Sequence, residues 1–418
     1  MTKACPPSRT VTLQTQTALG VPGPVSQCSS SDSAGTAATT GASAGAAKAT
    51  SQQVSAVLAS GLGTMGRRPR QPRRSWRALA AATGIALATA GLAACSGASA
   101  GTDSSNGSGE TITLYNGQHP QLTQAIVNAF EKQTGIHVKV RTDDGIVLAD
   151  QILQEGSHSP ADVYLTENSP ELMLLTQHQL LTQLPKSITS QIPAQYDSPT
   201  GNWVGISARV SALAYNPSVI SSSQLPASIL DLAQPQWKGK VAIAPTDSDF
   251  VPLVGAVIAT YGQSAALNWL RGLKSNATQD ADIETVAAAV NKGQDAVGII
   301  NQYYWYRLRT ELGDGGTHSQ VYYFPNHNVG GLENISGAAV LASSAHRAAA
   351  EKFVSFLVSA QAEKILAAGD TYEYPVRAGV APNPQLVPLS QVNPAILNVT
   401  SLGNDLAAAA LLQQAGLT

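Results

Sequence analysis

Side chains that can bind a hard metal ion follow three predicted strands of the chain, at the point where each strand ends. They are one imidazole, one carboxylate and two phenols: His119 after a strand over 111–117, Glu167 in a strand over 161–168, and Tyr303 and Tyr304 after a strand over 295–300. In open parallel sheets, ligands bind beyond the carboxyl ends of the strands. Anionic oxygen with one imidazole suits Fe³⁺. To bind, the phenols would lose protons that ordinarily have a pKa of about 10.

The two adjacent tyrosines can close on one ion only if they begin a helix. On a strand they would point to opposite faces, whereas in the first turn of a helix they diverge by about 100°. Asn301 is placed to cap that helix, and the helix N-terminus would favour phenolate charge. Adjacent aromatic residues at a helix start more often serve packing, and Trp305 and Tyr306 extend the aromatic run. Spacing alone leaves both roles open.

A fourth strand, predicted over 240–246, leads into an acidic loop. Asp247, Ser248 and Asp249 occupy it, just before a predicted helix over 249–262. These side chains could add negative charge to the same edge of the sheet, or Asp247 could simply cap the helix.

The elements that position these residues alternate along the chain between strand and helix. This order predicts an α/β fold with mostly parallel sheets flanked by helices. So long an alternation favours two lobes, with the chain crossing between them near 207–215 and 334–341. We expect lobe 1 to comprise 110–209 and 334–384, and lobe 2 to comprise 210–333 and 385–418. Residues 346–369 read as one long amphipathic helix.

The first 109 residues differ in character from the rest. Nine of the 25 basic residues but only one of the 27 acidic residues lie in 1–94, which leaves the remainder with a charge of about −10. An acidic body is a poor partner for nucleic acid. A cationic stretch from Met65, a short apolar run and Leu92-Ala93-Ala94-Cys95 predict a lipoprotein signal peptide over 65–94. We expect lipidation of Cys95, a Gly/Ser tether over 95–109, and a non-native extension over 1–64.

Several local motifs resemble bacterial ferric-ion-binding proteins, the capture subunits of iron ABC importers. They are LYNGQHP at 114–120, SPADVYLTE at 159–167, INQYYWYR at 300–307, SGAAVLASS at 336–344 and EYPV at 373–376. The resemblance implies a two-lobed type II periplasmic-binding-protein fold with an interlobe cleft. It also implies that His119, Glu167, Tyr303 and Tyr304 bind Fe³⁺, and that an ABC permease and its ATPase receive the iron. We expect a monomer on the outer face of the cytoplasmic membrane, held by its lipid alone and exported by the Sec or the twin-arginine route.

One loop departs from the family pattern. Relatives complete the iron shell with a bound anion on a Pro-Thr-Ser-Gly-Ala type loop, whereas this chain has Pro-Thr-Asp-Ser-Asp at 245–249. Two carboxylates there would repel phosphate, so we expect Asp247 or Asp249 to supply the missing charge. The residues that could still contact a small anion such as carbonate are Asn168, Asn301 and Arg209.

Two other functions remain open at this stage. The tyrosines with Trp305 could enclose an organic cation such as thiamine or a polyamine. Alternatively, the acidic loop with Glu167 and His119 could hold the ion of a metal-dependent hydrolase. No nucleophile elbow, phosphate-binding loop or general acid–base pair is evident, so we expect a binding protein and not an enzyme.

Overall fold

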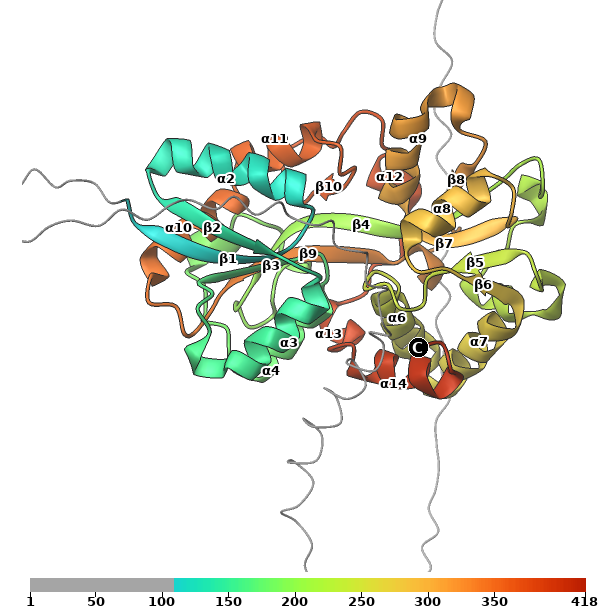
Figure 1. Ribbon diagram of the computed structural model, residues 1–418, viewed down its shortest axis with the longest axis horizontal. Coiled ribbons are helices and arrows are strands. Elements are labelled where there is room, and N and C mark those ends of the chain that lie inside the picture. The colour runs from blue at the N-terminus through green and yellow to red at the C-terminus, as the bar shows by residue number, and fades with distance from the viewer. Residues whose placement is uncertain (1–108) are drawn as a thin grey trace, which may run out of the picture. The chain divides into compact units, whose positions relative to one another are not determined.

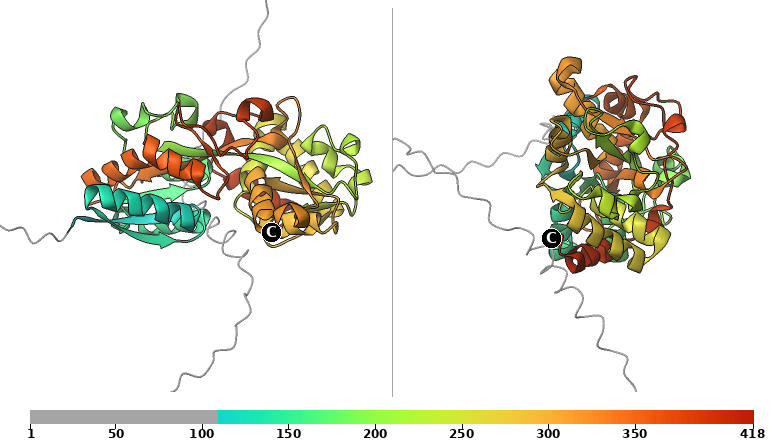
Figure 2. Two further views of the ribbon diagram at one scale, coloured as in Figure 1. Left: turned by 90° about the horizontal axis from the view of Figure 1, so that it is seen from above. Right: turned by 90° about the vertical axis from the view of Figure 1, so that its right-hand side faces the viewer.

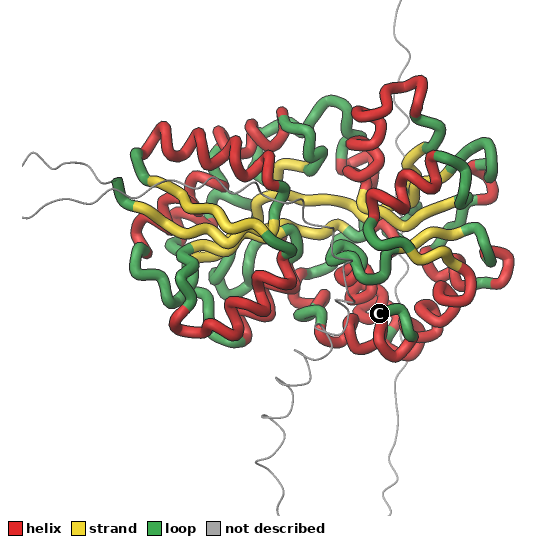
Figure 3. Tube along the Cα trace, in the orientation of Figure 1, coloured by secondary structure: helices red, strands yellow, loops and turns green. Residues whose placement is uncertain are grey.

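The computed structural model describes residues 109–418, in which a sheet of ten strands runs through the fold between layers of helices (Figures 1 and 3). The hydrogen-bonded order is β2-β1-β3-β9-β4-β7-β5-β6, with β8 and β10 pairing to β4. The predicted extension, signal peptide, lipidation site Cys95 and nearly all of the tether lie outside the described residues. Within 109–418, no helix combines the length and the apolar character that crossing a membrane requires.

The first half of the sheet contains the N-terminal strands, which pair in parallel as expected. Pro120 stands at the first position of α2, where its missing N–H costs nothing, and Gly135 ends that helix in the left-handed conformation. The elements are β1 (Thr111–Gly117), α2 (Pro120–Thr134), β2 (His137–Thr142), α3 (Gly145–Glu155), β3 (Val163–Thr166), α4 (Ser169–Gln177) and α5 (Lys186–Thr189).

The second half repeats the parallel arrangement with β5, β6 and β7. Figure 2 shows its helices, coloured yellow to orange, gathered apart from the blue-green N-terminal ones. The elements are β5 (Val241–Ile243), α6 (Val251–Tyr261), α7 (Gln263–Asn276), β6 (Ala277–Gln279), α8 (Ile283–Asn291), β7 (Val297–Asn301), α9 (Gln302–Gly316) and β8 (Gln320–Tyr322).

Two long antiparallel strands join the halves. β4 (Val204–Tyr215) and β9 (Glu333–Val340) are buried along their whole length and pair with each other. β9 continues the first half through β3, and β4 continues the second half through β7. β4 and β9 overlap the segments 207–215 and 334–341, where we expect the chain to cross between the lobes; the lobe boundaries drawn from these crossings stay a prediction. The apolar core forms two clusters. One lies within the second half, and the other is centred on the first half but extends into β5, α8, β7 and α9.

The predicted long helix over 346–369 is wrong. It is two helices, α10 (Arg347–Leu357) and α11 (Ala360–Ala368), because Ser359 adopts an extended conformation and its side chain accepts a hydrogen bond from the Ala362 N–H. The remaining elements are β10 (Tyr374–Pro375), α12 (Leu389–Val392), α13 (Val399–Leu402) and α14 (Leu406–Ala415), with short 3₁₀ helices η1 (Gly156–His158), η2 (Ala194–Tyr196), η3 (Ser222–Gln224), η4 (Ile229–Ala233), η5 (Pro235–Trp237) and η6 (Val329–Gly331). α14 packs on α6 and α7.

Candidate metal centre

The predicted ligands meet at one cavity of about 520 Å³, at the carboxyl ends of the strands. Each stands where a strand gives way to a helix. His119 lies between β1 and α2, Glu167 between β3 and α4, and Asp249 between β5 and α6, while Tyr303 and Tyr304 occupy the first turn of α9. The first two belong to one half of the sheet and the other three to the second half.

The two phenols converge on one carboxylate. The Tyr303 hydroxyl donates to Asp249 Oδ2 at 2.5 Å, and the Tyr304 hydroxyl donates to the same oxygen at 3.2 Å. Their rings stack, with centroids 4.2 Å apart. Tyr303 also donates to Glu167 Oε2 at 3.2 Å. A point near these oxygens is thus within reach of four acidic side chains.

The imidazole completes the group from the opposite side. His119 Nδ1 lies 3.4 Å from Glu167 Oε1, and the His119 ring meets the Tyr303 ring edge to face at 5.2 Å. His119 Nε2 is buried and has no hydrogen-bond partner in the described part of the chain. All four residues predicted from the resemblance are therefore brought together.

Arg209 supplies the positive charge of the centre. It lies on β4, is fully buried, and its Nη2 donates to Asp249 Oδ1 at 3.1 Å and to Asn168 Oδ1 at 2.5 Å. The same Asn168 oxygen accepts from Asn334 on β9 at 2.8 Å. Arg209 thus forms an ion pair with the side chain of Asp249. Arg209 on β4 and Asn334 on β9 both donate hydrogen bonds to Asn168, so the two joining strands hold that side chain in place.

Burial and like charges set the protonation of the centre. Desolvation, reinforced by Asp249, raises the pKa of Glu167 to about 8. Desolvation and the same carboxylate raise the pKa of Tyr303 and Tyr304 well above that of a free phenol. Burial alone would also raise the pKa of Asp249, but Arg209 and the Tyr303 hydroxyl hold it below its usual value. Without a metal, Asp249 is the ionised acceptor and both phenols are donors.

The acidic loop divides between two roles. Asp249 faces the phenols, whereas Asp247 accepts from the Asp249 N–H at 2.9 Å and from the Ile283 N–H at 3.1 Å. Asp247 therefore ties its own loop to the start of α8 and does not cap α6. Desolvation and the charge of Asp249 raise its pKa to about 8. Ser248 lines the cavity.

Asn301 occupies the N-cap position of α9, but its side chain does not cap the helix. Its Oδ1 accepts from the Ser211 hydroxyl at 3.2 Å instead, because β4 and β7 pair at these two residues. The expected capping bond is therefore wrong. The amide nitrogen of Asn301 is buried and, within 109–418, has no hydrogen-bond partner.

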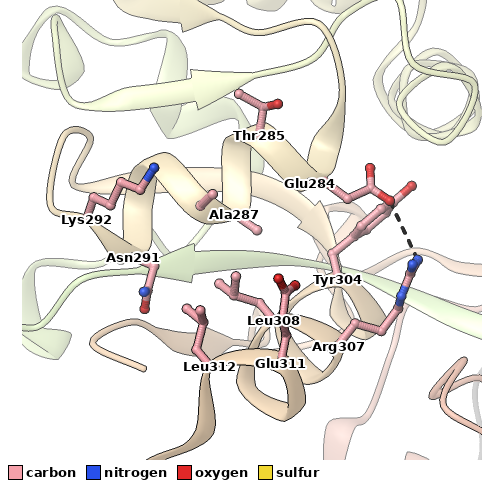
Figure 4. Close-up of a pocket in the computed structure, with 11 residues that line it drawn as sticks. Glu284, Thr285, Ala287, Asn291, Lys292, Tyr304, Arg307, Leu308, Glu311 and Leu312 are labelled. Atoms are coloured by element: carbon pink, nitrogen blue, oxygen red, sulfur yellow. Dashed lines mark ion pairs between the residues drawn. The ribbon is translucent and has the colours of Figure 1, made fainter. Parts of the chain in front are cut away.

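A second cavity, of about 410 Å³, adjoins the first behind Tyr304. It lies between α8 and α9, and the Glu284–Arg307 ion pair at 3.6 Å stands beside Tyr304 where the two cavities meet (Figure 4). The next two aromatic residues point elsewhere: the Trp305 N–H donates to the Ser319 carbonyl, and the Tyr306 hydroxyl accepts from the Val387 N–H. Only two of the four aromatic residues at the start of α9 line the first cavity.

Glu373 is the acidic residue of this centre that reasoning from the sequence missed. It is fully buried, and its carboxylate accepts from Gln118 Nε2 at 3.2 and 3.5 Å. Its Oε1 lies 3.9 Å from Arg209 Nη1. Glu373 is the first residue of the EYPV motif, and that motif is the one signal in the sequence that points to it.

Comparison with known proteins assigns the fold and the family. A sequence model described as bacterial extracellular solute-binding protein matches residues 148–394. The chain belongs to this family. The Fe(3+)-binding periplasmic protein of Serratia marcescens is 39% identical over 306 residues, covering 73% of this chain and 90% of the relative. The major ferric iron-binding protein of Neisseria meningitidis is 36% identical over 311 residues, covering 73% of this chain and 93% of the relative.

Solved structures of the family share the two-lobed fold. Iron-bound HitA from Pseudomonas aeruginosa is 40% identical and matches with a TM-score of 0.70, over 73% of this chain and 99% of that one. These relatives are binding proteins, so the expectation that this solute-binding protein is not an enzyme is confirmed. The hydrolase alternative is thereby excluded.

Proposed function

We propose that this protein captures ferric iron in the cleft and delivers it to the permease of an ABC importer. The observation that carries the proposal is the convergence of two phenol oxygens, Tyr303 and Tyr304, on the single carboxylate oxygen of Asp249. Oxygen donors of this kind suit a hard trivalent ion. The relatives from Serratia and Neisseria are named for their binding of ferric iron, which supports the same cargo.

In this proposal five side chains hold the iron. His119 and Glu167 approach from one half of the sheet, and Tyr303, Tyr304 and Asp249 from the other. The ion takes the place of the phenol protons, so two phenolates and two carboxylates surround a charge of +3, with Arg209 as the nearby cation. Because the donors come from both halves, binding holds the lobes together, and the permease reads the closed form.

Asp249 takes the part that an exogenous anion plays in related proteins. One oxygen of Asp249 accepts from Arg209 Nη2, although Arg209 Nε and Nη1 have no hydrogen-bond partner within 109–418. The carboxylate offsets the charge of that guanidinium, which leaves it less able to retain carbonate or phosphate. An anion in this cleft would also face Asp247 and Glu167. We therefore propose an iron shell that needs no added phosphate, with Asn168, Ser248 and Asn301 as its supporting polar side chains.

The rest of the proposal concerns delivery. The signal peptide over 65–94, lipidation of Cys95 and the tether over 95–109 would anchor a monomer to the outer face of the membrane. Lobe 1 would comprise 110–209 and 334–384, and lobe 2 the remainder of the described chain, where the packing of α14 on α6 and α7 supports assigning the C-terminus to lobe 2.

The test is the colour of the iron-loaded protein. Purified protein is mixed with ferric citrate in phosphate-free buffer, and the visible spectrum is recorded after removal of unbound iron. We expect a tyrosinate-to-iron charge-transfer band that disappears when Tyr303→Phe and Tyr304→Phe are combined. Tyr306→Phe is the matched control, because its ring faces away from the cavity, and it should keep the band. A colourless wild-type protein that retains no iron would refute the proposal.

The organic-cation alternative has less support. A cation-binding box would need several rings facing the ligand, whereas Tyr303 and Tyr304 stack on each other and Trp305 points into the fold.

A further inference from the structure

Three potential metal ligands of the centre come from a single half of the sheet. Ligand atoms of His119, Glu167 and Glu373 all lie within 4.8 Å of one another. His119 follows β1 and Glu167 follows β3, while Glu373 immediately precedes β10, which pairs with β4 at Ala208 and Ser207. None of the three belongs to the half that carries Tyr303, Tyr304 and Asp249. An ion bound by this set would need no contribution from the other lobe.

The three side chains are poorly satisfied by the protein itself. Glu373 is fully buried, yet both hydrogen bonds to its oxygens come from one amide group of Gln118, and Arg209 Nη1 at 3.9 Å is too far to donate. Within 109–418, His119 Nε2 is buried without a hydrogen-bond partner. An ionised carboxylate normally offers about four lone-pair sites. Buried acceptors with so few donors have capacity for a cation.

We propose that His119, Glu167 and Glu373 form a second cation-binding mode of the cleft, one that takes a divalent first-row transition metal ion such as Fe²⁺ or Mn²⁺. One imidazole and two carboxylates on one face of an ion, with water on the other face, suit such ions. Octahedral bonds of about 2.1 Å separate ligand atoms by about 3 to 4 Å. The side chains would therefore move together by roughly 1 Å or less on binding.

Charge balance distinguishes this mode from the ferric one. With both phenols protonated and the ion in place of any proton on Glu167 or Glu373, the carboxylates of Glu167, Glu373 and Asp249 together with Arg209 carry a net charge of −2, which a divalent ion cancels. The ferric mode replaces two phenol protons and so adds two negative charges, against one more positive charge on the ion. The divalent mode is thus the one open to the centre while the tyrosines keep their protons and their bonds to Asp249.

The proposal shares His119 and Glu167 with the proposed ferric site but does not need the tyrosines, and the test uses that difference. Co²⁺ is titrated into the purified protein and followed by its visible absorption and by calorimetry. We expect saturable binding of one ion. The double variant Tyr303→Phe with Tyr304→Phe should keep Co²⁺ affinity within about threefold although it loses the ferric band, because the phenols are not divalent ligands. Ferric citrate should displace Co²⁺ from the wild type.

Glu373→Gln should weaken Co²⁺ binding by at least about tenfold, since it removes a direct ligand. Glu363→Gln is the matched control. This glutamate is also buried, on α11, but its Oε2 accepts from the Val376 N–H, and it lines neither of the two cavities described above. Circular dichroism checks the fold of each variant. Should Glu373→Gln fail to fold, Glu373→Asp keeps the charge beside Arg209 while withdrawing the ligand by one methylene, and the same loss is expected.

Three results would overturn the proposal: no Co²⁺ binding by the wild type, equal binding by the variant at Glu373, or loss of Co²⁺ together with Fe³⁺ in the tyrosine double variant. The last would place the divalent ion in the ferric shell. A wild type that binds Co²⁺ but gives no ferric band would instead refute the ferric function and leave this site standing.

Discussion

Replacing Asp249 with asparagine isolates the feature that sets this cleft apart from the family pattern. The substitution keeps the size of the side chain and one acceptor oxygen but removes the charge. In the wild type one oxygen of Asp249 receives both phenols and the other receives Arg209. After Asp249→Asn, Arg209 loses its closest carboxylate, and the ferric ion loses an anionic ligand.

The expected loss follows from the burial of this pair. Arg209 and Asp249 have side-chain exposures of 0% and 3%. Breaking a buried ion pair by removing one partner costs about 3–5 kcal/mol. That cost is in folding free energy. The ferric affinity falls as well because the ion loses an anionic oxygen ligand, and a loss of about 3–4 kcal/mol corresponds to roughly 10²- to 10³-fold. Carbonate or phosphate should restore much of it, because the freed guanidinium and the unpartnered Asn301 amide can then hold an anion.

The assay is a competition titration against citrate, read from the tyrosinate–iron band, with and without added phosphate. Asp282→Asn is the matched control, since Asp282 lines the same cavity but caps α8 through the Thr285 N–H, a bond that asparagine can also accept. The control should bind iron as the wild type does. If Asp249→Asn binds iron as tightly as the wild type and ignores phosphate, Asp249 is not a ligand. If the wild type itself requires phosphate, the internal-anion argument fails.

Three further outcomes are expected. Iron affinity should rise with pH, because each ion displaces two phenol protons and, below the Glu167 pKa of about 8, a third proton from Glu167. The number of protons released per iron, measured at constant pH, should fall from about three to about two as the pH passes 8. A number that does not change with pH would contradict this. Arg209→Gln should destabilise the iron-free protein by about 3–5 kcal/mol but the iron-loaded protein by less, since the ion replaces the lost cation. Equal shifts in the thermal unfolding temperature of the two forms would count against the pairing of Arg209 with Asp249. Burial raises the pKa of Glu171 to about 8, so its contribution to stability is fully present below its unfolded value near 4.5 and is lost as pH rises through 8. Glu171→Gln should therefore reduce, by up to several kcal/mol, the decrease in the free energy of unfolding between pH 4.5 and pH 8, as measured by urea unfolding. If the free energy of unfolding of the variant depends on pH as that of the wild type does, Glu171 does not titrate in this range.

The parts of the fold that the sequence predicts are those with a strong local pattern. The strand before Tyr303 is an apolar run that ends in a polar residue, whereas the strand before His119 alternates threonines with apolar residues; both form as expected. The ends of the predicted strands locate the ligands, because the carboxyl ends of parallel strands lie at the same edge of the sheet. The joining strands were only roughly predictable, since polar residues such as Ser207, Arg209 and Glu333 interrupt both apolar segments. The break at Ser359 was not, because the apolar spacing of a helix continues on both sides of it.

The pairing of charges within the centre could not be read from the sequence. Arg209 and Asp249 are 40 residues apart, and whether a guanidinium holds a free anion or a side chain depends on which loop the fold brings beside it. The same is true of Glu373, which approaches His119 from the far end of the chain. Motif spacing orders such residues along the chain, but only the antiparallel contacts of β4, β9 and β10 place them together.

The tyrosine pair explains how one cleft could separate trivalent from divalent cargo. In the metal-free centre both phenols are satisfied by Asp249, so an ion must outcompete two hydrogen bonds and two phenol–proton bonds before it gains any phenolate. Burial raises the pKa of both phenols, which increases that cost. A charge of +3 recovers more of it than a charge of +2 does, because the attraction of each phenolate scales with the charge of the ion. Raised phenol pKa values cost every metal ion the same free energy when it binds through the tyrosines. Because divalent ions gain less from the phenolates, they are the first for which this binding becomes unfavourable, which leaves Fe³⁺ as the ion that closes the lobes. A variant with a lower phenol pKa, such as one carrying 3-fluorotyrosine at 303 and 304, should bind divalent ions through the ring oxygens and lose this discrimination. If fluorination leaves the ratio of Co²⁺ affinity to Fe³⁺ affinity unchanged, the selectivity arises elsewhere.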